Sequence, residues 1–350
     1  MNSVAKRKHF NKNNKTRSKV SKNKRKEKRK GGSKKSKRKT RTKKSNRRTR
    51  KNKNIKTNIN LSDIKENPEK FIKLNCSPEN KDKKYTCFSD EDLHKLREMW
   101  NARHPDAKIV TNDSKEIWTA LKQFYGRTCN KESCWVKQIA KGTPMEDELM
   151  DSFSPEMPPE WKKNPTEWLS SLDINDVMKQ YEQEYKCFDF IGPSPIDYDT
   201  QKLYGECVWE ELCHFSLADQ IKKGKTKIGI IFNTDPHYKG GSHWISLFIN
   251  IKKGRIFFFD SAGDKIPDQV MKFVNMVTEQ GHRLQRRIDF HFDQNYPNDH
   301  QQNTYSCGVY SLFFLVHMLE DKVTEHYLKT HQFKDEYIET FRKIYFNSEL

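Results

Sequence analysis

The chain has 350 residues, with 67 lysines and arginines, 47 acidic residues and a formal net charge of +20 at pH 7. Residues 1–60 hold 28 of these cations and one acid, which leaves 39 basic and 46 acidic residues in 61–350. The longest apolar run, 309–319, is too short to cross a bilayer, and no apolar signal segment opens the chain. These features exclude a membrane-spanning class and predict a soluble protein without a membrane partner.

The first segment, residues 1–56, is predicted to be a disordered basic arm, because its few apolar side chains cannot offset the entropy lost on ordering. Its cations favour non-specific, salt-dependent attraction to nucleic acid. The runs KRKEKRK and KKSKRK also fit nuclear-localisation patches, so targeting and DNA tethering both stay open. Aromatic side chains for base stacking are not interleaved, so sequence-specific recognition is not indicated.

The next segment, residues 60–145, is predicted to be a small helical module. Ser89 is suited to cap one helix, since Asp92 follows three residues later. Asp113 or Ser114 is suited to cap a second helix, which carries an apolar stripe on one face. The proline-rich stretch 146–160 is predicted to be a linker.

The eight cysteines are scattered through a chain without a secretory signal, which favours a reducing compartment and mostly free thiols. In the helical module, Cys76, Cys87, Cys129 and Cys134 offer four soft ligands for a metal ion. Their spacing departs from that of a typical zinc site, so free core thiols are the preferred interpretation and structural zinc is the alternative.

Residues 161–350 are predicted to form an α+β domain, with a small mixed sheet packed against helices. A helix over 166–185 precedes an extended, turn-rich segment at 190–199. Three β-rich runs follow, at 227–234, 244–251 and 255–260, and the last two are joined as a hairpin through Lys252, Lys253 and Gly254. The remaining expected elements are a helix near 266–280, a strand at 287–294, and helices after Cys307, near 322–330 and near 335–345.

A histidine and an aspartate are placed where the proposed hairpin can bring them together. His243 lies immediately before one strand of the hairpin, and Asp260 ends the other. In such a pair the carboxylate fixes the tautomer of the imidazole, which then accepts and returns the proton of a nucleophile. Either residue alone is more often structural, so the pair indicates catalysis only when a nucleophile accompanies it.

The nucleophile candidate is Cys307, which is followed by Gly308 and a long apolar run. This pattern predicts a thiol at the N-terminus of a buried helix, where free N–H groups and the positive end of the helix dipole favour a thiolate. Gln301, six residues earlier, is placed to offer its side-chain amide to an oxyanion, with the backbone N–H of Cys307 as the second donor. A lone buried cysteine is more often a small hydrophobic residue, so the combination is what indicates catalysis.

The order His-Trp, Asp-Ser, Gln and Cys-Gly, with 17 residues from His243 to Asp260 and 47 from Asp260 to Cys307, resembles the adenovirus-protease and SUMO-deconjugating-protease superfamily of cysteine peptidases. The stretches WLSSLDINDVMKQY, FIGPSPIDYD, GGSHWISLFI and FFFDSAG are similar to stretches in the thiol proteases of nucleocytoplasmic large DNA viruses. The resemblance covers roughly residues 160–320 and extends to the helical module around 84–138.

This resemblance implies a role for each site residue. His243 would be the general base and acid, Asp260 would orient the ring of His243, Cys307 would be the nucleophile, and Gln301 would donate a hydrogen bond to the oxyanion. Trp244 resembles the aromatic residue that lines the substrate cleft. Ser306 is a departure, because similar proteases often have aspartate before the nucleophile. Gln302 stands beside Gln301, so the choice between the two glutamines rests on the six-residue spacing to the cysteine.

The resemblance also implies an endopeptidase that cleaves after small residues, commonly at Gly-Gly-Xaa sites, and processes viral structural polyproteins during virion maturation. Its chemistry needs no metal and no organic cofactor. The expected location is the virion and the viral factory in the host cytoplasm, or the nucleus. Two alternatives stay open: a deubiquitinase or deSUMOylase-type deconjugating protease that acts on host proteins, and an inert protease fold that serves as a nucleic-acid-binding virion protein.

Overall fold

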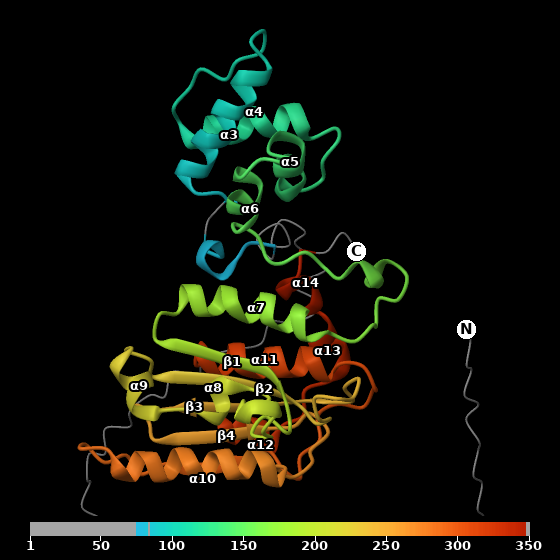
Figure 1. Ribbon diagram of the computed structural model, residues 1–350. Helices are drawn as coiled ribbons and strands as arrows, with labels where there is room; N and C mark the ends of the chain where they lie inside the picture. The colour runs from blue at the N-terminus through green and yellow to red at the C-terminus, as the bar shows by residue number, and fades with distance from the viewer. Residues whose placement is uncertain (1–74, 83–84, 348–350) are drawn as a thin grey trace, which may run out of the picture. The chain divides into compact units, whose positions relative to one another are not determined.

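The computed structural model describes residues 75–82 and 85–347 (Figure 1). The predicted basic arm, residues 1–56, and the first part of the helical module, residues 60–74, lie outside the described residues. Within the described part of the chain, no helix combines the length and the apolar content needed to cross a membrane.

The helical module packs around a core of its own. Its helices are α3 (Asp90–Arg103), α4 (Ser114–Tyr125), α5 (Glu132–Ile139) and α6 (Met145–Met150), preceded by a 3₁₀ turn at Pro78–Asn80. The hydroxyl of Ser89 accepts a hydrogen bond from the N–H of Asp92, whose carboxylate in turn accepts one from the N–H of Ser89. The carboxylate of Asp113 caps α4. The structure thus confirms the predicted cap Ser89 and selects Asp113 from the two candidates, Asp113 and Ser114, for the second helix.

Helix α6 lies at the start of the stretch that was expected to be a linker. Leu149 and Phe153 are buried in the core of the helical module. The prediction of a linker over 146–160 is therefore wrong for its first half. The stretch's three prolines all follow Ser154, so they leave the apolar spacing of the preceding turn intact.

Six of the eight cysteines form disulfides, which pair Cys76 with Cys87, Cys129 with Cys134, and Cys207 with Cys213. Cys187 and Cys307 are free. The expectation of mostly free thiols is therefore wrong, and the four cysteines of the helical module have no thiolate left for zinc. Spacing alone could not reveal the first pair, because Cys76 is positioned by a β-bridge to the distant Phe153.

A five-stranded sheet forms the centre of the α+β domain. Its strands are β1 (Phe188–Pro195), β2 (Lys227–Asn233), β3 (Trp244–Asn250), β4 (Arg255–Phe259) and β5 (His291–Gln294), in the order β1-β2-β3-β4-β5. The two outer pairs are parallel, and the pairs β2–β3 and β3–β4 are antiparallel. The segment expected to be turn-rich at 190–199 thus belongs partly to β1, and β5 covers the second half of the strand expected at 287–294.

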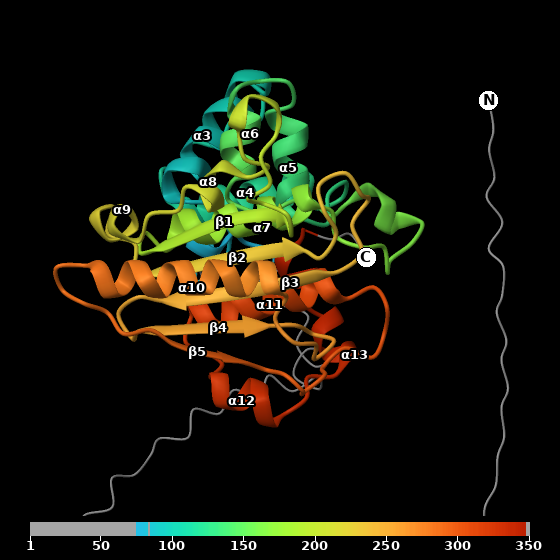
Figure 2. The same cartoon turned by 60° about the horizontal axis from the view of Figure 1, so that its bottom comes forward.

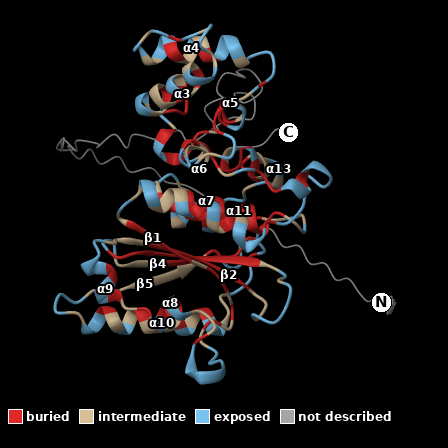
Figure 3. Ribbon diagram, turned by 45° about the horizontal axis from the view of Figure 1, so that its top comes forward, coloured by how far each residue is buried: buried red, intermediate tan, exposed pale blue. Residues whose placement is uncertain are grey.

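Helices cover both faces of this sheet (Figure 2). Helices α7 (Ser171–Glu184) and α11 (Cys307–Leu319) share a core with Ile231, Phe248 and Phe257 on one face. Helix α10 (Asp268–Arg283) packs against the alternate residues of the same strands on the other face. The central strands are therefore buried on both sides, as Figure 3 shows by colour.

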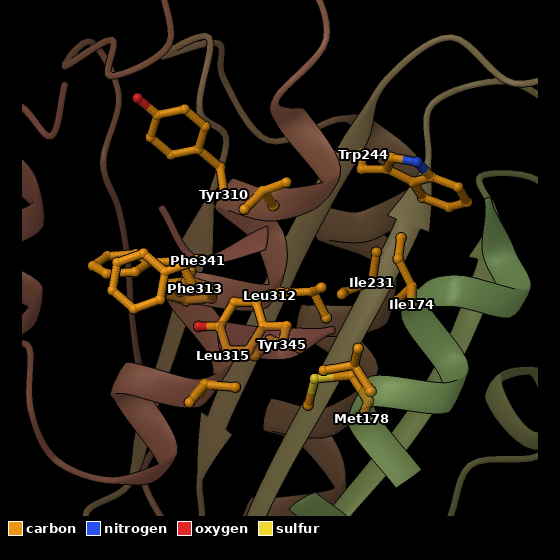
Figure 4. Close-up of a cluster of buried hydrophobic side chains, with 14 of the residues drawn as sticks. Ile174, Met178, Ile231, Trp244, Tyr310, Leu312, Phe313, Leu315, Phe341 and Tyr345 are labelled. Carbon is orange, nitrogen blue, oxygen red and sulfur yellow. The ribbon is translucent and has the colours of Figure 1, made fainter. Parts of the chain in front are cut away.

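The remaining short elements connect and close the domain. They are the 3₁₀ turns Pro159–Lys162 and Leu203–Gly205 and the helices α8 (Glu210–Cys213), α9 (Leu217–Lys222), α12 (Glu325–Thr330), α13 (Asp335–Glu339) and α14 (Arg342–Tyr345). Figure 4 shows the core beneath α11, where Leu312 and Leu315 lie close to Ile174 and Met178 of α7. Burial of α11 fixes the position of its first residue, Cys307.

Candidate active site

His243 and Asp260 meet at one end of the β3–β4 hairpin. The antiparallel register pairs Ser246 with Phe259, so the start of β3 lies beside the end of β4. His243 Nε2 lies 2.7 Å from Asp260 Oδ1, and the Asp260 carboxylate is almost fully buried. A hydrogen bond of 2.8 Å from the N–H of Ala262 holds the same Oδ1 in place. The carboxylate therefore fixes the ring with its Nε2–H pointing at Asp260.

The His243 ring has a second partner in the side chain of Cys307. Nε2 faces Asp260, so the proton exchanged with the thiol passes through Nδ1. Burial lowers the pKa of His243, but the hydrogen bonds and charges of Asp260 and Cys307 outweigh burial and raise that pKa to about 10. At neutral pH the ring is therefore held as an imidazolium between the side chains of Asp260 and Cys307.

Cys307 is the first residue of α11 and is 2 % exposed. The first N–H groups of a helix have no partner within the helix, so the backbone at this position can donate to a developing negative charge. Gly308 is required for close packing, because a Cβ there would lie 3.0 Å from Cβ of Leu169. The same Leu169 accepts a 3.0 Å hydrogen bond from the indole of Trp244.

The two adjacent glutamines point to different partners. Gln301 Oε1 accepts a 2.7 Å hydrogen bond from the hydroxyl of Ser261, the residue after Asp260. Its Nε2 donates to the carbonyl of Asn303 at 2.8 Å. The amide of Gln302 instead donates to Asp299 at the exposed surface. The contacts of Gln301 are thus those that tie it to the residues around Asp260 and Cys307.

Three residues that hold this arrangement are missing from the predicted site, namely Ser261, Asn295 and Asn303. Asn295 is fully buried and exchanges hydrogen bonds with the backbone of Asp260, at 2.9 and 2.7 Å. Ser261 orients the Gln301 amide, and its carbonyl accepts the N–H of Gln301 at 2.8 Å. No sequence motif marks these roles, because the partners lie 35 and 40 residues apart in the chain.

A groove of about 680 Å³ runs past the start of β3, where Trp244 lines it. This side chain is only 8 % exposed, so it forms the floor. Trp168 also lines the groove and is 41 % exposed, and Trp209 contributes a further aromatic side chain. Gly240 lines the same wall, where the absence of side chain keeps the groove open.

The site as a whole has the parts needed for acyl transfer. They are a thiol at a helix N-terminus, an imidazolium held by a buried carboxylate, the free backbone N–H groups at that N-terminus, and the Gln301 amide held by Ser261 and Asn303. Among the described residues, the one group of candidate metal ligands comprises Cys207, Cys213 and His214, and its two cysteines form a disulfide.

Comparisons with known proteins agree with this chemistry. Residues 217–350 match the profile of the Ulp1 protease family, C-terminal catalytic domain. A candidate thiol protease of Acanthamoeba polyphaga mimivirus is 27 % identical over 299 residues, covering 78 % of this chain and 93 % of that protein. A cysteine protease of African swine fever virus is 25 % identical over 256 residues, covering 68 % and 90 %. The crystal structure of the African swine fever virus protease shares the fold, with a TM-score of 0.57, 20 % identity and 78 % and 95 % coverage.

The fold, the profile match and these relatives define the class of the protein, which is a cysteine protease. More particularly, the chain carries an Ulp1-like peptidase domain and is similar to proteases of two nucleocytoplasmic large DNA viruses.

Proposed function

We propose that the protein is a cysteine endopeptidase that cuts after small residues, at Gly-Gly-Xaa sites, and processes viral structural polyproteins during virion maturation. In this proposal Cys307 is the nucleophile, His243 the general base and acid, Asp260 its orienter and Gln301 an oxyanion donor. The observation that carries the assignment is the contact chain Cys307–His243–Asp260.

The reaction follows from the positions of these groups. The thiolate of Cys307 attacks the carbonyl carbon after the small residue, and the resulting oxyanion accepts hydrogen bonds from Gln301 and the Cys307 backbone. The imidazolium of His243 gives its proton to the leaving amine, which leaves a thioester on Cys307. Water then attacks the thioester while His243 takes one of its protons, and the carboxylic acid departs as the thiolate is restored.

The preference for glycine is supported by the groove that Trp244 lines. Gly240 and Gly241 line the same groove. A groove lined by glycines and a flat ring accommodates an extended backbone better than branched side chains.

A peptide panel tests the proposal. Peptides with Gly-Gly-Xaa sites and controls with Ala-Ala-Xaa or Val-Val-Xaa are incubated with the full chain and with its Cys307→Ala variant. We expect cleavage after the second glycine by the wild type and none by the variant. Equal cleavage by both would remove Cys307 from the mechanism, and cleavage of the control sites at the same rate would remove the glycine preference.

Deconjugation of a ubiquitin-like modifier from host proteins is the second candidate function. One relative from African swine fever virus is named a SUMO-1 cysteine protease. Large apolar side chains are also exposed around the groove, where Lys202 and His237 line it and their neighbours Leu203, Tyr204 and Tyr238 are 84, 101 and 75 % exposed. Such side chains suit a folded partner better than a short peptide. Faster cleavage of full-length modifier precursors than of peptides with the same cut site would favour this candidate.

The other alternative, an inert fold that binds nucleic acid, conflicts with the assignment of the chain to the cysteine proteases. Non-specific nucleic-acid binding through residues 1–56 is still proposed as an added property of the enzyme, on the strength of the 28 cations in residues 1–60. Deletion of residues 1–56 should abolish salt-sensitive retention on DNA without loss of peptide cleavage. We propose the virion and the viral factory, or the nucleus, as its locations.

A further inference from the structure

The residue before the nucleophile is bonded to a carboxylate that comes from far along the chain. Ser306 is fully buried, and its hydroxyl donates a 2.6 Å hydrogen bond to Glu339 Oε1, at the end of α13. The same hydroxyl accepts a 2.6 Å hydrogen bond from the side-chain amide of Asn303. A carboxylate thus reaches the position next to Cys307 from the C-terminal part of the domain.

Glu339 is itself held rigidly. Its Oε2 accepts a 2.8 Å hydrogen bond from Arg342, whose side chain is 6 % exposed. The guanidinium group of Arg342 also donates to the carbonyl of Glu167 at 2.8 Å and lies 4.5 Å from the ring centre of Trp161. These contacts fix the carboxylate on the protein's own framework, so that it offers Ser306 an acceptor with little freedom to move.

From Ser306 the contacts continue to the oxyanion donor. Asn303 Oδ1 accepts the N–H groups of Tyr305 and Ser306, both at 2.9 Å. The carbonyl of Asn303 accepts the side-chain N–H of Gln301 at 2.8 Å. The orientation of the Gln301 amide and the course of the backbone into Cys307 therefore both depend on how Asn303 is held.

We propose that Glu339 is a positioning residue of the oxyanion hole, acting through Ser306 and Asn303 on the amide of Gln301 and the N–H of Cys307. The carboxylate touches neither substrate nor thiol. Its effect belongs to the step in which negative charge develops on the carbonyl oxygen, because only that step needs both donors aligned. This inference rests on the proposed function of Cys307 as the nucleophile.

Two reactions of the same thiol separate this role from a merely structural one. Peptide hydrolysis passes through an oxyanion, whereas alkylation of Cys307 by iodoacetamide forms none and depends only on the thiolate and access to it. For Glu339→Ala we expect kcat to fall about tenfold or more with KM nearly unchanged, because one oxyanion donor is worth about 10² or more and this change misplaces rather than removes it. The rate of alkylation at neutral pH should stay within about twofold of the wild type.

The matched control is Glu336→Ala, which removes an exposed carboxylate from the same helix and should change neither rate. A charge exchange provides the rescue. Ser306→Asp alone places two carboxylates together and should lower kcat. The double variant Ser306→Asp with Glu339→Gln again pairs one carboxylate with one hydrogen-bond donor, so it should recover most of the lost kcat.

The outcomes are distinct. An unchanged kcat in Glu339→Ala would overturn the inference, and so would an equal loss of hydrolysis and alkylation with a lowered Tm, which is the mark of a general structural defect. Failure of the charge exchange to recover activity above the single variants would count against it as well. Hydrolysis that persists in Cys307→Ala would instead overturn the proposed function itself.

Discussion

At the scale of single residues, the protonation of His243 controls the proposed reaction. Asp260 and Cys307 raise the pKa of the ring to about 10, so the ring is an imidazolium across the neutral range. The charged ring is the proton donor to the leaving amine, and it is lost as pH rises through its pKa. The alkaline limit of activity therefore reports on the Asp260 contact.

Changing Asp260 to Asn should move this limit. The carboxamide keeps the shape of the side chain but loses the negative charge that favours the imidazolium, so the pKa of His243 falls. We expect the alkaline limb of kcat/KM to move down by about one pH unit or more, together with a lower maximum. A pH profile of peptide cleavage measures this shift, with the exposed and nearby Asp264→Asn as control; coincident profiles for all three proteins would refute the assignment.

The two adjacent glutamines give the second prediction at this scale. Gln301→Ala removes a side-chain donor that is tied to Ser261 and Asn303, so kcat should fall by about 10² with a smaller change in KM. Gln302→Ala removes a surface contact with Asp299 and should leave kcat within about twofold. Steady-state kinetics of the two variants measures these values of kcat. A larger loss of kcat in Gln302→Ala than in Gln301→Ala would assign the oxyanion-donor role to Gln302.

At the scale of elements, the N-terminus of α11 and the start of α7 are packed against each other through Gly308 and Leu169. A methyl group on Gly308 would press on the Leu169 side chain at 3.0 to 3.3 Å. The carbonyl of Leu169 also holds the Trp244 indole. Packing at this one point therefore links the nucleophile to the floor of the groove.

Gly308→Ala should destabilise the fold by about 1–3 kcal/mol through this overlap. Leu169→Ala should also destabilise, because it leaves a cavity in the core. In the double variant the added methyl group occupies part of that cavity, so the loss should be smaller than the sum of the two single losses by about 0.5 kcal/mol or more. Urea unfolding of the four proteins measures this coupling, and strict additivity would show that the two residues do not press on each other.

Much of the element structure could be predicted from the sequence. The hairpin, the helix after Cys307 and the caps Ser89 and Asp113 follow from local periodicity and capping chemistry, and the structure confirms them. The hairpin also places His243 and Asp260 at one end, so their contact could be anticipated. Elements without strong local signals escaped prediction, such as the short helices α5 and α9.

What the sequence could not provide are contacts between distant segments. The Ser261–Gln301 and Ser306–Glu339 hydrogen bonds join residues 40 and 33 positions apart, and no local pattern marks either pair. The disulfides were missed for a different reason. They join cysteines 11, 5 and 6 positions apart, but the lack of a secretory signal favoured free thiols. The roles assigned to the site residues by resemblance stay predictions until the variants are measured.

At the scale of the whole molecule, we propose a division into a basic arm, a helical module and the protease domain, with the module reaching to about Phe153. The last two are connected by hydrogen bonds within the described residues. Lys81 bonds to Tyr185 and Glu320, and Gln180 donates to the carbonyl of Phe153. The helical module is thus attached to α7 and to the C-terminal end of α11, the helix that begins at Cys307.

Acid sensitivity of the whole fold is predicted from His300. It is fully buried, and burial lowers its pKa to about 4. Its Nδ1 accepts the N–H of Phe333, which requires the neutral ring. The unfolded chain binds a proton near pH 6.5 and the folded chain does not, so this residue's contribution is present above pH 6.5 and is lost as pH falls toward 4.

The free energy of unfolding should therefore fall by up to roughly 3 kcal/mol between pH 6.5 and 4 on account of this residue. Urea midpoints across that range measure the slope. His300→Gln should make it shallower, with the remainder due in part to His317, whose pKa burial also lowers to about 4, whereas the exposed His326→Gln should leave it as in the wild type. An unchanged slope in His300→Gln would assign the acid sensitivity to other groups.

The central claim is that Cys307 is the nucleophile of a protease that accepts glycine before the cut. Intact and tryptic mass spectrometry of the full chain tests this claim most directly, after incubation at neutral pH with a Gly-Gly peptide whose terminal carboxyl group is replaced by a vinyl methyl ester (–CH=CH–CO2CH3), to which a thiolate adds without a leaving group. We predict one covalent adduct, on Cys307, that is absent in Cys307→Ala and much slower in His243→Ala. An adduct on Cys187, or no adduct while iodoacetamide still labels Cys307, would contradict the claim.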